Sequence, residues 1–406
     1  MLGSNKKLSF IPYMVLLSFF AVHPISTKAE EGILQPDIHA QAAVLIDAKT
    51  GSVLLKKNET DVLYPASITK IVTGIIALET AKPYDRVTVS KEARYEDGTR
   101  VYLSEGEQQS MINLIYALMM NSGNDAATAI AEHIDGSKKA FAERMNAFVK
   151  EKAGATNTQF QNPHGLHDKA HYTTALDMAK IAQYAMQNET FRKIVGTKTK
   201  PWDGNEWDSD LVNHNKLLWT YEGATGIKNG FTDQSRFTLV ASARREDTEL
   251  IGVLLKSDSK EATFSDMTHL FDYGFEKFET KQIIDANQTM VSEGKENPLT
   301  FIAKEAAWIT VKKTEQPELK VDSDGNLWVS NAAGGPERAA RLVPVKLPQV
   351  VNDISAPPVK RLFVWHYLIT FFWAAMIGFL IVIAAAIRRK NKSVQTRNQV
   401  DLFHAP

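Results

Sequence analysis

The chain has 406 residues, a formal net charge of zero and no cysteine. Its length allows a large core and a smaller second unit. The balanced charge, without a basic stripe interleaved with aromatic residues, gives no support for a nucleic-acid partner. The lack of cysteine excludes disulfides, a catalytic thiolate and zinc sites built on thiolates.

The first 29 residues have the pattern of a secretory signal peptide. Lys6 and Lys7 form a basic start, an apolar run covers 8–22, and small residues end at Ala29. We expect cleavage after Ala29, which would place most of the chain that follows outside the cytoplasm. An uncut membrane anchor is the alternative interpretation.

Hydrophobic periodicity predicts an α+β domain over residues 30–280, followed by a small all-β domain over 281–350. Strands near both ends of the first domain indicate one sheet, assembled from distant segments and covered by helices. The predicted elements of that domain are a hairpin at 42–58, helices at 68–78, 111–134 (broken at 121–125) and 175–186, strands at 237–245 and 248–256, and a helix at 262–275.

A second long apolar segment, residues 364–387, has no acidic or basic side chain apart from His366. As a helix it would be about 36 Å long, enough to cross a hydrocarbon core of ~30 Å. The segment follows a linker at 351–363, and basic residues come directly after it. The positive-inside rule then puts the tail, 388–406, in the cytoplasm. A buried core helix is the alternative.

Ser67 and Lys70, in the stretch YPASITKIVTG, suggest a nucleophile and its base. Residues three apart share a helix face, and Pro65 favours a helix start just before Ser67. The first amides of a helix favour developing negative charge. An ordinary lysine has a pKa of about 10.4, but burial or a neighbouring cation can lower it until the amine accepts a proton. Alone, this spacing more often marks a helix cap and a solvated lysine.

Two further segments carry candidate residues. Ser122 and Asn124 lie two positions apart at the break between helices, where both side chains can face one cleft. Lys228, Asn229 and Gly230 come just before a predicted strand, where a lysine can hold a carboxylate and a glycine admits substrate backbone. Each segment alone is more often an ordinary turn.

Taken together, the order Ser-x-x-Lys, Ser-x-Asn, Lys-x-Gly resembles that of the penicillin-binding proteins. The chain is similar to the low-molecular-mass members, which are serine-type D-alanyl-D-alanine carboxypeptidases, over roughly residues 34–281. The similarity extends through the segments YPASITKIVTG, MMNSGNDAATAIAEHI, FQNPHGLHDKAHYTTALDMAKIAQYA, NHNKLLW and GATGIKNGFTDQSRFTLVASARR. It implies a penicillin-binding/β-lactamase-like transpeptidase fold and no cofactor or metal.

The resemblance also implies catalytic roles. Ser67 would attack the carbonyl between the two terminal D-alanines of a peptidoglycan stem peptide, while Lys70 takes the serine proton. Ser122 would relay a proton to the leaving amine, and Asn124 would orient the substrate amide and Lys70. β-Lactam antibiotics imitate the D-alanyl-D-alanine end and would stop the enzyme at the acyl stage.

For the motif at residues 228–230, the resemblance implies a role in substrate recognition. Lys228 would bind the terminal carboxylate, together with Asn229 and Gly230, and would help to keep Lys70 neutral. The backbone N–H groups of Ser67 and Phe231 would form the oxyanion hole.

Three departures from the family pattern concern recognition. Asn229 stands where the family usually has threonine, and residues 234–236 replace a common acidic-Ala-Gly stretch. After the second strand, Lys256 and Lys260 occur where many members carry an arginine. We therefore expect an intact acylation machinery in a slower or more selective carboxypeptidase.

Other functions remain as alternatives. A catalytically weakened binding module on the same fold is one, and a β-lactamase is another. A zinc peptidase is a third, because His164, His167 and His171 lie close together in sequence. Four large apolar side chains are expected in the core: Met119, Met120, Trp219 and Phe271.

Overall fold

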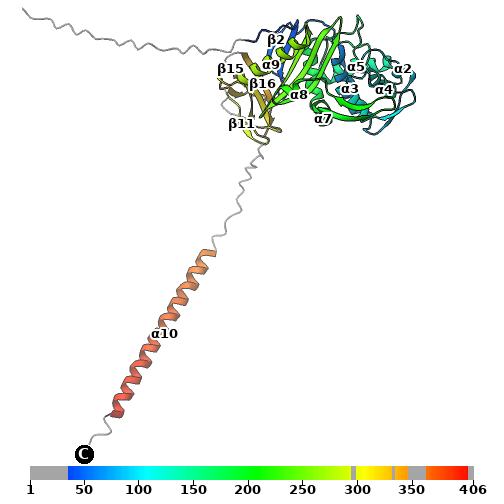
Figure 1. Cartoon of the computed structure of the whole chain (residues 1–406). Coiled ribbons are helices and arrows are strands. Elements are labelled where there is room, and N and C mark those ends of the chain that lie inside the picture. The colour runs from blue at the N-terminus through cyan, green and yellow to red at the C-terminus, as the bar shows by residue number, and fades with distance from the viewer. Residues whose placement is uncertain (1–34, 294–298, 332–333, 346–362, 401–406) are drawn as a thin grey trace, which may run out of the picture. The chain divides into compact units, whose positions relative to one another are not determined.

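The computed structural model describes residues 35–293, 299–331, 334–345 and 363–400 (Figure 1). These residues belong to two compact units that divide after Val345. The predicted signal peptide and most of the predicted linker lie outside the described residues.

A five-stranded antiparallel sheet forms the centre of the first unit. Its strand order is β2-β1-β9-β8-β7, so the first and last strands of the domain are neighbours. This confirms the predicted sheet from distant segments. The strands are β1 (Ala42–Asp47), β2 (Val53–Lys57), β7 (Ala224–Thr232), β8 (Arg236–Arg245) and β9 (Thr248–Ser257).

Both faces of this sheet are covered, which explains why β1 is buried at every position. Successive side chains of a strand point to opposite faces. Val44 and Ile46 therefore join the larger core on the helical face, while Ala43 and Leu45 join a second core on the other face. A strand with two covered faces needs a continuous apolar run, as in the AAVLI stretch of β1.

Helices flank the sheet, as expected. The second core contains α9 (Lys260–Lys277), which packs Met267, Leu270 and Phe271 against it. The larger core takes residues from α1 (Lys70–Thr80), α3 (Met111–Met120), α4 (Asn124–Asp135), α5 (Lys138–Ala153), α6 (Ala175–Ala185) and α7 (Glu189–Gly196). Shorter elements are α2 (Lys91–Arg94), α8 (Leu217–Thr220) and the hairpins β3 (Arg86–Thr88) with β4 (Gln108–Ser110) and β5 (Thr199–Asp203) with β6 (Asp208–Val212).

The structure adds to one expectation about this domain and contradicts another. Lys228, Asn229 and Gly230 precede the strand expected after them, β8, but they lie inside a further strand, β7. Trp219 is not a core residue, because its surface is 46% exposed, whereas Met119, Met120 and Phe271 are buried. The predicted helix at 68–78 begins with a 3₁₀ turn, η1 (Ala66–Thr69), that runs into α1.

The chain continues from α9 into short strands in three small sheets. Their apolar side chains form a separate small core that includes Phe301, Leu327 and Leu342. The strands are β10 (Phe278–Ile284), β11 (Thr289–Val291), β12 (Thr300–Ile302), β13 (Ala307–Lys312), β14 (Glu318–Val321), β15 (Asn326–Asn331), β16 (Gly334–Arg341) and β17 (Val343–Pro344). This segment is called the small β domain below; its limits at 281 and 350 stay a prediction.

The second unit contains one helix, α10 (Phe363–Val400), within its described residues. Its stretch His366–Lys390 has a mean hydropathy of 2.5 and is long and apolar enough to cross a membrane. None of that stretch is buried within the described residues. The predicted apolar C-terminal helix is therefore present, and it is a candidate membrane anchor.

A close approach at Gly165 tests the packing around η1. Gly165 has φ +91°, and a Cβ there would lie 1.9 Å from the Ala66 carbonyl oxygen. Gly106 has a similar φ of +77° with no atom within 4 Å of such a Cβ. The left-handed conformation costs an alanine roughly 1 kcal/mol at either position. We expect Gly165→Ala to lower the free energy of unfolding in urea by several times the loss from Gly106→Ala. Equal losses would contradict this packing.

Candidate active site

Ser67 lies in η1 at the entry to α1 and is half-buried. Contacts from distant segments hold this turn in place. Thr238 Oγ1, on β8, donates a hydrogen bond to the Pro65 carbonyl oxygen at 2.9 Å. Ala66 has a positive φ of +52°, and Gly165 packs against its carbonyl. The nucleophile predicted from sequence therefore sits on a tightly fixed turn.

Lys70 is the first residue of α1 and is fully buried. Its Nζ lies 3.0 Å from Ser67 Oγ, 2.7 Å from Asn124 Oδ1 and 2.8 Å from the His164 carbonyl oxygen. A neutral amine donates two hydrogen bonds and accepts one. The amide and carbonyl oxygens can only accept, whereas the Ser67 hydroxyl can donate. A protonated Lys70 could donate to all three oxygens, and a neutral Lys70 that accepts the Ser67 proton fits the same contacts.

The electrostatic environment favours the neutral form of Lys70. Burial lowers the pKa of Lys70 well below its ordinary value, and the positive charge of Lys228 lowers it further. Asp125 and Glu96 act in the opposite direction on the Lys70 pKa, but they are weaker influences than burial. Lys228 is also fully buried, and burial lowers its pKa to about 7. Two cations in one dry site oppose each other, so the site favours at least one neutral amine.

Asn124 opens α4, and both ends of its side-chain amide are occupied. Its Nδ2 donates to the Asp97 carbonyl oxygen at 2.6 Å, which turns Oδ1 toward Lys70. Asp125 accepts hydrogen bonds from the backbone N–H groups of Val101 and Leu103, so the same loop stays beside the helix start. The break between α3 and α4 thus fixes the position of Asn124.

Ser122 lies at this break in the left-handed region, with φ +61° and 5% of its surface exposed. A serine rarely adopts this conformation, which is common at functional turns. The structure places Ser122 two residues before Asn124, the residue that touches Lys70.

Strand β7 brings the third motif to Ser67. It is an edge strand of the sheet, and its open side meets η1. A Cβ at Gly230 would lie 2.7 Å from the Ser67 backbone nitrogen, so this approach requires glycine. Lys228 Nζ donates to the Asn229 carbonyl oxygen at 2.9 Å. Phe231 is 46% exposed at the same edge.

Two cavities adjoin this edge, and Asn229 and Lys260 line both. The smaller, about 230 Å³, also has Phe231 and Thr263 in its wall, and the larger, about 590 Å³, has His214 and Trp219. Lys256, the other lysine considered from sequence, is not among the residues around either cavity. Lys260 is therefore the one placed beside the β7 motif.

The pKa of His214 reflects the positive charge of this region. Partial burial, together with the positive charges of Lys228, Lys260 and Lys70, lowers the pKa of His214 to about 4. Three lysines thus act on one imidazole, which suits a site for an anionic group.

The three histidines considered as zinc ligands have other partners. His171 Nε2 lies 2.8 Å from Thr69 Oγ1, and His164 Nδ1 accepts from the Leu166 N–H. His167 packs edge-on against Tyr64. Within the described residues, no group of three His, Cys, Asp or Glu side chains is arranged to hold a metal ion. The geometry gives the zinc-peptidase alternative no support.

Sequence reasoning missed two supports of the site. The His164 carbonyl contacts Lys70, and Thr238 fixes the Pro65 carbonyl. The segment NPHGL was recognised only as part of a longer resemblance, and nothing in the pattern pointed to its backbone. Every residue has a backbone carbonyl, so the residue type does not show which of these carbonyls will accept a hydrogen bond in the site.

Comparison with known proteins identifies the family. The D-alanyl-D-alanine carboxypeptidase family profile matches residues 29–259, more than half of the chain. The chain is 34% identical over 289 residues to the D-alanyl-D-alanine carboxypeptidase DacF of Bacillus subtilis, covering 68% of this chain and 73% of that one. It is 32% identical over 346 residues to DacA of Haemophilus influenzae, covering 79% and 84%. The chain belongs to this carboxypeptidase family.

A solved structure agrees with the fold. Penicillin-binding protein 5 of Haemophilus influenzae superposes with a TM-score of 0.68 at 29% identity, covering 77% of this chain and 98% of that chain. The α+β penicillin-binding fold expected from sequence is thereby confirmed.

The two buried lysines predict a bell-shaped pH dependence for acylation by benzylpenicillin. Below the lowered pKa of Lys70 the base is protonated and the rate falls. Above pH about 7, Lys228 loses the charge that would hold the ligand carboxylate, and the rate falls again. Arginine keeps its charge in this range, so Lys228→Arg should remove the alkaline limb, at a lower absolute rate. The second-order acylation rate constant from pH 5 to 10 tests this. An unchanged alkaline limb in the variant would contradict the assignment to Lys228.

Proposed function

We propose that this enzyme removes the terminal D-alanine from peptidoglycan stem pentapeptides through an acyl-enzyme on Ser67, and that β-lactams block it. The contact set of Lys70 carries this proposal. One buried amine touches the candidate nucleophile and two oxygens that can only accept hydrogen bonds. Family membership supplies the substrate class.

Acylation follows from this geometry. Ser67 Oγ attacks the carbonyl carbon of the D-alanyl-D-alanine bond while its proton passes to Lys70 Nζ. The oxygen of the tetrahedral intermediate receives hydrogen bonds from the Ser67 and Phe231 backbone N–H groups, of which one donor is typically worth about 3–4 kcal/mol. The close packing of Gly230 on the Ser67 nitrogen supports this arrangement.

The second half of the reaction returns the protons. The C–N bond breaks, and Ser122 passes a proton from Lys70 to the nitrogen of the departing D-alanine. Water then attacks the ester, with Lys70 again as the base, and releases the shortened peptide and Ser67. Asn124 holds Lys70 in line for both steps, since its own amide is fixed by Asp97.

The peptide would add along the part of the β7 edge that η1 does not cover, as strands do at sheet edges. Lys228 supplies the cation behind that edge, while Asn229 offers an amide N–H in place of the family's threonine hydroxyl. Lys260 lines the same cavities as Asn229. We assign Lys260 the second positive charge for the substrate carboxylate, since the arginine common in the family is missing.

The cellular setting follows from the two ends of the chain. A signal peptide cut after Ala29 would export the catalytic domain, and α10 would hold it on the outer face of the cell membrane as a single-pass anchor. The apolar stretch His366–Lys390 supports the anchor. The basic residues at its C-terminal end, Arg388, Arg389 and Lys390, support a cytoplasmic tail.

Replacement of the nucleophile tests the activity. We expect the purified full chain in detergent to bind fluorescent penicillin covalently and to release D-alanine from a stem pentapeptide. Ser67→Ala should abolish both, because only Ser67 forms the acyl bond. Penicillin labelling without D-alanine release at high enzyme concentration would instead favour the catalytically weakened alternative. Rapid turnover of nitrocefin would favour a β-lactamase.

Lys260→Gln tests the carboxylate site, with Lys256→Gln as its control. Both lysines are exposed and both changes remove one charge, but only Lys260 lines the cavities beside Asn229. We expect Lys260→Gln to raise KM for the pentapeptide about three- to tenfold with little change in kcat, whereas Lys256→Gln leaves both unchanged. A C-terminally amidated substrate should show no difference among the three enzymes. Equal KM for both variants would refute the role of Lys260.

A further inference from the structure

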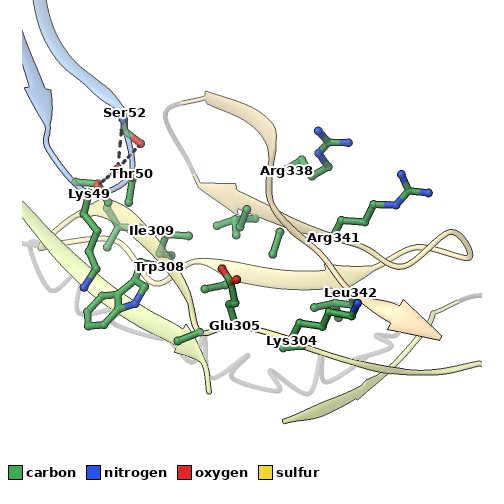
Figure 2. Close-up of a pocket in the computed structure, with 18 residues that line it drawn as sticks. Lys49, Thr50, Ser52, Lys304, Glu305, Trp308, Ile309, Arg338, Arg341 and Leu342 are labelled. Atoms are coloured by element: carbon green, nitrogen blue, oxygen red, sulfur yellow. Dashed lines mark hydrogen bonds between the residues drawn. The ribbon is translucent and has the colours of Figure 1, made fainter. Parts of the chain in front are cut away.

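A third cavity, about 430 Å³, lies where the β1–β2 turn meets the small β domain (Figure 2). Lys49, Thr50 and Ser52 of the turn form one wall. Strands β13 and β16 of the small β domain supply most of the rest, including Trp308, Arg338 and Arg341. None of the residues proposed above for catalysis lines it, so its function is separate from the chemistry at Ser67.

Specific contacts hold this junction together. Thr50 Oγ1 lies 2.6 Å from Thr310 Oγ1, and the Lys49 ammonium lies 3.0 Å from the centroid of the Trp308 ring. Thr280 Oγ1, on β10, donates to the carboxylate of Asp47 at the end of β1. Hydrogen bonds and a cation–π contact therefore hold together the two segments between which the cavity lies.

The rim of the cavity is positively charged. Arg338, Arg341 and Lys304 are exposed and have no ion-pair partner among the described residues. Figure 2 shows both arginines on the same stretch of chain. Unpaired arginines with accessible forks recognise carboxylate or phosphate groups with two parallel hydrogen bonds.

The remainder of the lining adds two other kinds of contact. The floor is apolar and buried, made by Ala307, Ile309, Val311, Val329 and Leu342. Glu305 is the single acidic residue of the lining, and it has no ion-pair or hydrogen-bond partner among the described residues. A carboxylate only accepts hydrogen bonds, so a ligand that pairs with Glu305 would supply hydroxyl or amide donors.

We propose that this cavity binds an anionic saccharide–peptide segment of peptidoglycan. The arginines would hold a free carboxylate of the stem peptide, the apolar floor would take the face of an N-acetylated sugar or a methyl group, and Glu305 would accept from hydroxyl or amide groups. A phosphate polymer lacks this mixture, and Glu305 would repel it. The choice of polymer rests on the proposed function.

The cavity would be a second binding site for the polymer, at a distance from Ser67. Binding of one strand segment by the cavity raises the effective concentration of neighbouring stem peptides at the active site. The effect is confined to polymeric substrate, because a short soluble peptide cannot occupy both sites.

The experiment measures binding with Ser67 already blocked. The full chain in detergent is acylated with benzylpenicillin and titrated with a fluorescent disaccharide–tetrapeptide, followed by anisotropy. The test variant is Arg338→Gln/Arg341→Gln. The control, Lys313→Gln/Lys320→Gln, removes two positive charges from the same domain at exposed positions outside the cavity. We expect the test variant to bind at least tenfold more weakly, while the control binds like the parent chain.

Substrate kinetics give a second readout. On soluble pentapeptide, all three chains should have the same kcat and KM. On polymeric peptidoglycan, the arginine variant alone should show a raised KM with an unchanged kcat. Normal kinetics on soluble peptide also show that the variant is folded.

Two results would overturn the proposal. One is equal binding of the saccharide–peptide by all three chains. The other is cavity-dependent binding of a glycerol phosphate oligomer that is tighter than binding of the saccharide–peptide. Failure of the proposed function would appear separately, as absence of penicillin acylation. The titration would then use Ser67→Ala in all three backgrounds, and the loss in the arginine variant would still decide the question.

Discussion

The burial of Lys70 is the constraint on which the site depends. An ammonium group without water is costly unless paired, and the oxygens within reach of Nζ carry no formal charge. Lys228, buried in the same region, adds repulsion. Loss of a proton relieves both costs and leaves a neutral amine that can act as the base for Ser67, the proposed nucleophile. The fold thus creates reactivity by excluding water, without a histidine between nucleophile and base.

This arrangement depends on long-range packing. Thr238 and Pro65 are 173 positions apart, yet one hydrogen bond joins them and sets the distance between the sheet and η1. Gly230 and Gly165 allow backbone to approach Ser67 and Ala66 from two sides. Larger side chains at either glycine would push these segments apart. Stability of the domain and alignment of the nucleophile therefore share the same contacts.

Features that depend on local sequence were predictable. The Ser67–Lys70 spacing, the β1–β2 hairpin and the apolar C-terminal helix follow from periodicity and turn residues. Strand β7 was not predicted around Lys228 to Gly230, because asparagine and glycine are typical of turns. Trp219 was wrongly expected in the core, because the apolar character of a side chain does not show whether it packs in the core or lines a cavity. The roles of all the predicted site residues stay predictions, including those of Ser122 and Phe231.

The protonation state of Lys70 tests this account most directly. The full chain, labelled with ¹³C at lysine Cε, can be titrated by NMR, with Lys70→Arg to assign the signal. The account predicts that Lys70 titrates well below the 10.5 of an ordinary lysine, and that Lys228→Met moves its pKa upward. A Lys70 signal that titrates near 10.5 in the folded chain would contradict the neutral-base mechanism.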